Sequence, residues 1–153
     1  MVHLERLTRD NWRQVITLDI ADDQRRFLET PSVLYGVAEV QFHPTYIPYA
    51  VYDGDTVVGF AVYGCTPEDA ARWWIPLILI DHRYQGKGFG RAAMQAIIVS
   101  IRQQAPDCRE IALSYKPDNV AAERLYLSLG FEKTDEIDER GQVTARLIVK
   151  QSV

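Results

Sequence analysis

The sequence is poor in the features that mark specialised classes of protein. Only two of its 153 residues are cysteines, Cys65 and Cys108, and their spacing fits neither a disulfide scaffold nor a metal site. No apolar run approaches the ~18 residues that span a membrane. Neither sign of charge dominates, because 17 Lys and Arg stand against 21 Asp and Glu, for a net charge of −4. This balance argues against a protein built to bind nucleic acid.

The first residues also lack the basic segment and apolar stretch of a secretory signal. Together with the unpaired cysteines, this predicts a cytoplasmic protein that contacts neither membrane nor nucleic acid. What is present is ordinary for a globular protein, with 47% apolar and 25% charged residues. At roughly 150 residues per domain, residues 1–153 are expected to form a single domain whose core needs no disulfides.

The hydrophobic pattern predicts an α/β fold with one mixed sheet and helices on both faces. Asp53-Gly54-Asp55 predicts an antiparallel hairpin, since glycine supplies positive φ, and Thr8 and Gly130 are suitable helix caps. The strand–helix–strand step over 72–114 is expected to be a right-handed parallel crossover. Strands are expected at 2–7, 49–52, 56–64, 72–81, 110–114, 131–138 and 144–150, and helices at 11–20, within 32–42, at 88–104 and at 119–129.

The most informative segment is the glycine-rich turn that follows the strand at 72–81. Glycines at 86, 88 and 90 come where the strand ends and a helix begins. The first N–H groups of a helix have no internal partners and carry the positive end of its dipole, and glycines let phosphate oxygens approach them. Arg83, Lys87 and Arg91 add positive charge. We interpret the turn as a cradle for a pyrophosphate.

Two well-known phosphate cradles do not fit this turn. The dinucleotide-binding fingerprint requires Gly-x-Gly-x-x-Gly, whereas these glycines alternate, and the P-loop requires Ser or Thr after the lysine, where Gly88 follows Lys87.

Two motifs in register instead resemble the GNAT superfamily of N-acetyltransferases. Gln85-x-x-Gly88-x-Gly90 is similar to its acyl-CoA-binding signature, Gln/Arg-x-x-Gly-x-Gly/Ala. The segment from Asn119 to Phe131 resembles its Asn-x-x-Ala-x-x-Leu-Tyr-x-x-x-Gly-Phe helix and strand start. Four shorter segments resemble those of bacterial spermine/spermidine acetyltransferases, namely Phe27-Leu28-Glu29, 59–64, Arg72-Trp73-Trp74 and 81–88.

The resemblance implies a mostly antiparallel sheet of about seven strands, in which a central parallel pair splays apart to admit acetyl-CoA; no metal is implied. Pro76 departs from the pattern and fits either a bulge that opens the sheet or an edge strand. The pantetheine arm would pair with 78–80, and the pyrophosphate would lie on the amides of 85–91. The residues expected to bind the cofactor are Ile78, Leu79, Ile80, Gln85, Gly86, Lys87, Gly88, Phe89, Gly90, Arg91, Asn119 and Tyr126.

The resemblance also implies the chemical roles. Tyr126 lies two helical turns after Asn119, on the same helix face, and its phenol would protonate the departing CoA thiolate; Asn119 also suits the N-cap. An alkylamine with pKa ~10.4 must lose a proton before it attacks, and Glu29 is the candidate base. Glu29, Glu39 and Trp74 are expected to bind the substrate. Three scattered histidines are interpreted as surface residues: His3, His43 and His82.

The leading hypothesis is an acetyl-CoA-dependent N-acetyltransferase whose partner is a small-molecule amine, with a polyamine such as spermine or spermidine favoured. Carboxylates and aromatic rings of the N-terminal half suit such a polycation. Besides Glu29, Glu39 and Trp74, the acidic and aromatic residues of this half include Tyr35, Tyr46, Tyr63, Glu68, Asp69 and Trp73. Acetylation of a protein N-terminus, a lysine or another small amine stays open, as do a non-catalytic acyl-CoA-binding regulatory module and a homodimer.

Overall fold

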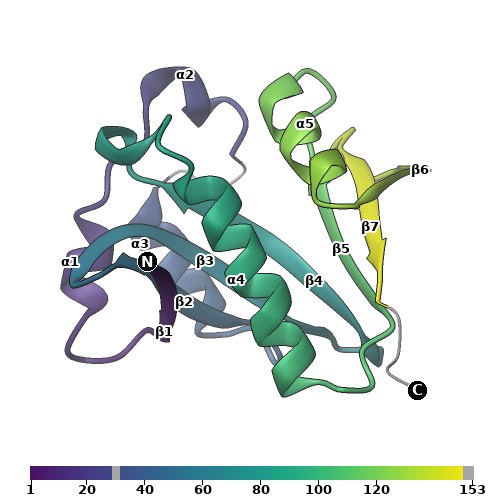
Figure 1. Ribbon diagram of the computed structural model, residues 1–153, viewed down its shortest axis with the longest axis horizontal. Helices are drawn as coiled ribbons and strands as arrows, with labels where there is room; N and C mark the ends of the chain where they lie inside the picture. The colour runs from purple at the N-terminus through teal and green to yellow at the C-terminus, as the bar shows by residue number, and fades with distance from the viewer. Residues whose placement is uncertain (29–31, 150–153) are drawn as a thin grey trace.

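Seven strands form one sheet in the order β1-β2-β3-β4-β5-β7-β6 (Figure 1). The computed structural model describes residues 1–28 and 32–149. β4 and β5 run parallel, and every other pair of neighbours is antiparallel, so the predicted mixed sheet is confirmed. The strands are β1 (Val2–Arg6), β2 (Ile47–Asp53), β3 (Thr56–Thr66), β4 (Asp69–Ile80), β5 (Glu110–Tyr115), β6 (Glu132–Ile137) and β7 (Val143–Ile148).

Helices cover both faces of the sheet, as predicted. α4 (Phe89–Gln104) crosses the front in Figure 1, and Met94, Ile97 and Ile101 of this helix are fully buried against Ile111 and Leu113 of β5. A second core on the opposite face joins buried residues of the N-terminal helices to β3 and β4. The other helices are α1 (Trp12–Ile16), α2 (Asp22–Arg25), α3 (Val33–Val40) and α5 (Val120–Ser128).

The N-terminal helices differ most from prediction. The helix expected over 11–20 is only the five-residue α1, and its N-cap position is Asn11 rather than Thr8. Beyond the end of α1, the backbone N–H of Asp19 donates to the Asp81 carboxylate, 2.8 Å away. α2, which no pattern predicted, has four residues, too few for a helical period to show.

β4 carries a bulge at Pro76. Trp74 pairs with Gly64 and Leu77 with Val62, so three steps along β4 match two along β3. The extra residue inverts the alternation of side chains: Ile75 before it and Ile78 after it both pack on the α4 side. β4 is a central strand, so the bulge interpretation of Pro76 is confirmed and the edge-strand interpretation is wrong.

The bulge lies where β4 and β5 separate. Their pairing comprises Arg72 with Glu110, Trp73 with Ile111 and Trp74 with Ala112, and within the described residues it ends there. At the closed end, the Glu110 carboxylate lies 2.6 Å from Arg72 Nε and 3.5 Å from Arg146 Nη1. The strands then diverge toward their C-terminal ends (Figure 1).

The described helices do not include one that combines the length and the apolar character of a membrane span.

Candidate active site

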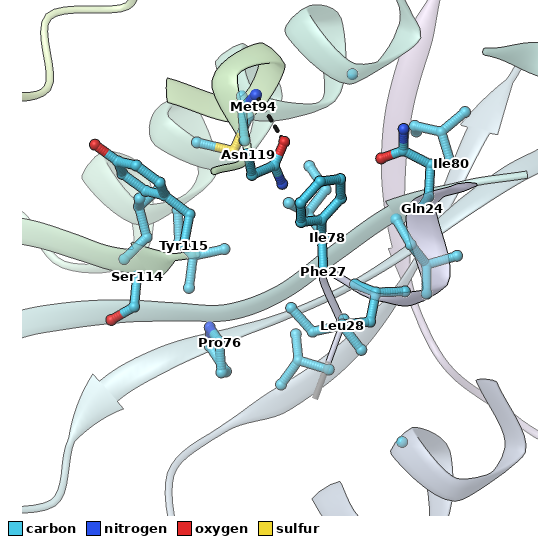
Figure 2. A pocket seen from close by; sticks show the side chains of 18 of the residues that line it. Gln24, Phe27, Leu28, Pro76, Ile78, Ile80, Met94, Ser114, Tyr115 and Asn119 are labelled. Atoms are coloured by element: carbon cyan, nitrogen blue, oxygen red, sulfur yellow. Dashed lines mark hydrogen bonds between the residues drawn. The ribbon is translucent and has the colours of Figure 1, made fainter. Parts of the chain in front are cut away.

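A cavity of about 620 Å³ fills the opening between β4 and β5 (Figure 2). Its walls come from both sides of the sheet, with the starts of α4 and α5 on one side and α3 with the turn after it on the other. Most of the residues predicted to bind the cofactor line it: Ile78, Leu79, Ile80, Gln85, Gly86, Gly88, Phe89, Gly90, Asn119 and Tyr126. Lys87 and Arg91 are not among the lining residues.

The glycine turn has the geometry of an anion site. Gly86 (φ +77°) and Gly88 (φ +84°) adopt the left-handed conformation that disfavours other residues, and neither has a neighbour where a Cβ would be. Gly88 occupies the N-cap position of α4, and its carbonyl accepts the first helical hydrogen bond, from Ala92. The amides of residues 89–91 therefore precede the helical ladder and are open to a ligand.

The charged residues of this turn do not all face the cavity. The Arg83 guanidinium binds the Asp81 carboxylate through both Nε (2.9 Å) and Nη2 (3.1 Å). Arg91 donates to the hydroxyl of Ser128 on α5, and Lys87 Nζ lies 5.9 Å from the centre of the Tyr84 ring. Arg83 is thus already paired with a buried carboxylate, and a contact of these cations with the phosphates stays a prediction.

The side-chain amide of Asn119 can cap α5 with its oxygen and face the cavity with its nitrogen. Its Oδ1 accepts from the backbone N–H of Ala122 at 3.2 Å, which confirms it as the N-cap of α5. Figure 2 shows the other end of the same amide directed into the cavity. A contact between this amide nitrogen and the cofactor stays a prediction.

Tyr126 is held between two aromatic rings, with centroids 5.7 Å from Tyr115 and 6.1 Å from Phe131. Its carbonyl accepts the N–H of Phe131 in a helix end closed by Gly130 at φ +99°. The Tyr126 hydroxyl has no hydrogen-bond partner among the described residues, whereas the Tyr115 hydroxyl donates to Glu123 Oε2 at 3.0 Å. Burial raises the pKa of Tyr126 to about 12, so the phenol keeps its proton at neutral pH.

Comparison with known proteins agrees with this geometry. The model of the Acetyltransferase (GNAT) family matches residues 5–131. A spermine/spermidine N(1)-acetyltransferase of Bacillus subtilis strain 168 is 31% identical, over 98% of both chains. A probable spermine N(1)-acetyltransferase of Bacillus subtilis subsp. natto is 30% identical over the same shares.

The chain belongs to the GNAT acetyltransferase family. It is an N-acetyltransferase that uses acetyl-CoA, as the sequence resemblance implied. Solved structures with low identity share the fold. An aminoglycoside acetyltransferase, AAC(6')-Ib, in complex with coenzyme A has a TM-score of 0.79 at 17% identity, with 97% of this chain and 95% of that chain covered. The ribosomal-protein-S18-alanine N-acetyltransferase from Escherichia coli has a TM-score of 0.73 at 17% identity, with 100% and 97% covered.

The residues of this GNAT enzyme fit acetyl-CoA. On the cavity side, β4 is released from β5 over Ile78–Ile80, so its backbone groups there are available to a pantetheine arm. The open glycine turn suits the pyrophosphate. Gln85 supports the strand end, since its Nε2 donates to the Ile80 carbonyl at 3.1 Å. Within the described residues, no three His, Cys, Asp or Glu side chains gather as a metal site requires.

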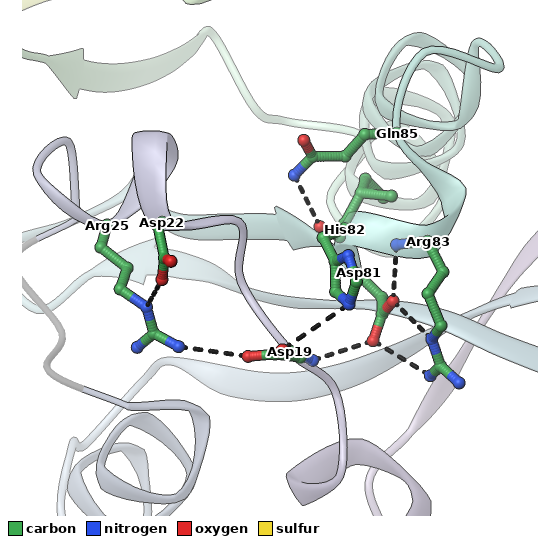
Figure 3. A network of polar contacts seen from close by, with 8 residues as sticks. Asp19, Asp22, Arg25, Asp81, His82, Arg83 and Gln85 are labelled. Atoms are coloured by element: carbon green, nitrogen blue, oxygen red, sulfur yellow. Dashed lines mark hydrogen bonds and ion pairs between the residues drawn. The ribbon is translucent and has the colours of Figure 1, made fainter.

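Asp81 fixes the start of the cradle (Figure 3). This fully buried carboxylate accepts the backbone N–H groups of Asp19 and Arg83 in addition to the Arg83 guanidinium. His82 donates its N–H to the Asp19 carbonyl at 2.8 Å, and Arg25 binds the Asp19 carboxylate at 3.1 Å. Burial alone raises the pKa of Asp81, but the hydrogen bonds, first of all from Arg83, outweigh it and lower the pKa to about 2.

We predict that Asp81 stabilises the fold only in its ionised form. Its folded pKa of about 2 lies below the ordinary 3.8, so the contribution is present above about pH 4 and is lost as the pH falls toward 2. Asp81→Asn should lower the free energy of unfolding by about 2 kcal/mol at pH 6, and less at lower pH. Urea unfolding from pH 6 to pH 2 measures this, with the exposed Asp22→Asn as control. If Asp81→Asn lowers the free energy of unfolding by the same amount at every pH, ionised Asp81 is not the source of the stabilisation.

On the acceptor side, Glu39 and Trp74 line the cavity as predicted, and Glu29 lies outside the described residues. Of the other aromatic and acidic residues considered, only Tyr46 joins them. Tyr63 is buried with its hydroxyl 2.9 Å from Ser100 Oγ, and Asp69 pairs with Arg109 at 3.3 Å. The remaining ones, Tyr35, Glu68 and Trp73, do not line the cavity.

His43, interpreted from the sequence as a surface residue, is half-buried and also lines the cavity. Its Nδ1 accepts the backbone N–H groups of Thr45 (3.2 Å) and Tyr46 (3.1 Å), and its ring stacks on Tyr46 with centroids 3.6 Å apart. The neutral imidazole therefore carries its proton on Nε2, and its one lone pair is already used. His43 shapes the wall and is unsuited to act as the base.

Several cavity residues were missed from the sequence. Phe27 and Leu28 line the cavity from the segment after α2. The Lys116 ammonium donates a hydrogen bond to the Arg26 carbonyl of this segment. Phe27 and Leu28 belong to a segment that resembles relatives, but no local pattern places their side chains in the site, because only the tertiary fold brings them to the opening. Ser114 of β5, which no pattern indicated, also lines the cavity.

Proposed function

We propose that this GNAT enzyme acetylates a primary amine of a polyamine such as spermine or spermidine. The observation that carries the proposal is a single cavity that joins the glycine turn and Tyr126 to Glu39 and Trp74 on the other side of the sheet. A cofactor bound at the turn and an amine bound beside α3 would meet in the opening between β4 and β5. The relatives named as spermine or spermine/spermidine acetyltransferases support this choice of amine.

The proposed mechanism is direct transfer with Tyr126 as the acid. Acetyl-CoA supplies an acyl group activated as a thioester. The uncharged amine forms its N–C bond at the carbonyl carbon while the C–S bond breaks, and the nitrogen loses one proton to solvent. Tyr126 supplies a proton to the sulfur and regains one from water, so the products are the N-acetylamine and the CoA thiol. Tyr126 suits this role because its hydroxyl is uncommitted among the described residues and stays protonated.

The acceptor wall suits a long chain with separated positive charges. Glu39 is exposed at the mouth and is the acidic residue among the described lining residues. Tyr46 and Trp74 add aromatic faces, and the Trp74 ring already has the Arg72 guanidinium 5.2 Å from its centre. An ammonium group beyond the reacting amine would find a carboxylate at the mouth and aromatic faces along the wall.

We expect kcat/KM for spermidine to exceed that for hexylamine and to fall with rising salt, because the attraction between separated charges is screened. Glu39→Gln should lower the spermidine value about two- to fivefold, the effect of an exposed ion pair, and leave hexylamine unchanged. The measurement is CoA-thiol release at low and high salt. Glu5→Gln on β1, outside this cavity, removes the same charge and serves as the control.

Other outcomes would redirect the proposal. Equal, salt-insensitive values for the two amines would reject a polyamine and keep the acetyltransferase. Release with a lysine peptide or a peptide N-terminus, and not with polyamines, would place the substrate among proteins.

A further inference from the structure

Ser114 lies on β5 just beyond the point where this strand leaves β4. The last pair joins Trp74 to Ala112, and Ser114 is the next residue whose side chain points to the same face as Ala112. Leu113 and Tyr115 pack into the core beneath α4, so Ser114 faces away from α4, toward the acceptor side. The cavity reaches Ser114 there, and Figure 2 shows it across the opening from Pro76.

The hydroxyl of Ser114 is buried and has no hydrogen-bond partner among the described residues. A buried hydroxyl in this state opposes folding, because it has lost water and gained nothing in return. Trp73 Nε1 is the other such atom, but Trp73 packs in the core and does not line the cavity. Of these two atoms, the Ser114 hydroxyl therefore combines a missing partner with a position in the reaction path.

The opposite strand offers neither a backbone N–H nor a polar side chain at this level. Pro76 has no backbone N–H, and its ring occupies the β4 side of the opening. His43, the titratable ring of the acceptor wall, has its lone pair engaged by two backbone amides. Among these side chains, the Ser114 hydroxyl on β5 is therefore the uncommitted acceptor for the N–H of an arriving amine.

We propose that the Ser114 hydroxyl binds the attacking nitrogen of the amine. It accepts a hydrogen bond from the N–H of the substrate and so directs the nitrogen lone pair toward the thioester carbonyl. Ser114 makes and breaks no covalent bond, and the amine proton goes to solvent as in the proposed mechanism. This inference rests on the proposed acetyl transfer to an amine, but it does not depend on which amine is used.

The test is Ser114→Ala. It should lower kcat/KM for the amine about tenfold, the effect of one hydrogen bond, while the KM for acetyl-CoA and the calorimetric acetyl-CoA affinity stay unchanged. The melting temperature should stay the same or rise, because the lost hydroxyl had no partner in the free enzyme. Ser114→Thr keeps a hydroxyl on a residue that suits a strand and should restore most of the activity.

Ser100→Ala is the matched control. Its hydroxyl is bonded to Tyr63 and Gln104 at 2.9 Å and 2.8 Å, so removing it should lower the melting temperature and leave the amine kinetics unchanged. If Ser114→Ala keeps wild-type kcat/KM, or loses stability as Ser100→Ala does, the assignment of Ser114 is overturned while the acetyltransferase stands. If the wild type binds acetyl-CoA but releases no CoA with any amine, the proposed function fails, and the role of Ser114 with it.

Discussion

Tyr126→Phe is expected to lower kcat by about 10²- to 10⁴-fold, the usual contribution of positioned proton transfer. The substitution removes a single hydroxyl that makes no hydrogen bond to the described residues, so neither the ring packing against Tyr115 and Phe131 nor acetyl-CoA affinity should change. Because burial raises the pKa of Tyr126 to about 12, the acid form is present throughout the neutral range. Loss of rate without loss of binding is the expected signature.

Tyr115→Phe provides the matched control for this prediction. Tyr115 belongs to the same aromatic group, but its hydroxyl donates to Glu123 and is not free for chemistry. The control should lose stability through this hydrogen bond and keep most of its kcat. Single-turnover measurements must show that chemistry limits the rate. If Tyr126→Phe then keeps most of the wild-type kcat, another group or water protonates the thiolate.

The cofactor half of the site could be predicted from sequence because its determinants are local. The glycine turn, the Asn119 cap and the helix end at Gly130 are short segments whose conformation depends on residues a few positions apart. For Pro76 the sequence left a bulge and an edge strand open, since a proline cannot complete a central ladder, and the position of β4 inside the sheet decides for the bulge. The order of the elements predicted a mixed sheet with helices on both faces, and the resemblance of the two motifs implied the GNAT fold.

Apart from Glu39 and Trp74, the rest of the site could not be predicted, because its determinants are long-range. The backbone N–H of Asp19 donates to the Asp81 carboxylate, 62 residues away in sequence, and the same carboxylate binds the Arg83 guanidinium. The burial of the Ser114 hydroxyl follows from where two strands stop pairing, which no residue pattern states. His43 reads as a scattered polar residue until the fold places it in the cavity wall.

The glycine turn can be tested without straining the backbone. Gly88→Val is a poor choice, because Gly88 has φ +84° and a branched residue there would lower stability whatever the ligand does. Gly90 lies inside the first turn of α4 and is not among the positive-φ glycines, and a Cβ there would meet only Leu125 Cδ2, at 3.9 Å. Since valine is a better helix former than glycine, Gly90→Val should fold with unchanged or greater stability.

Gly90→Val is expected to weaken acetyl-CoA binding about 10- to 100-fold. The new side chain would stand in the cavity beside the amides that open α4, and each charge-assisted hydrogen bond lost there costs about 1.5–3 kcal/mol. Isothermal calorimetry with acetyl-CoA measures the affinity, and thermal unfolding confirms that the protein is folded. Gln95→Val places the same side chain on the exposed face of α4 and should leave the affinity unchanged. Unchanged acetyl-CoA affinity in a folded Gly90→Val protein would remove the glycine turn from the cofactor site.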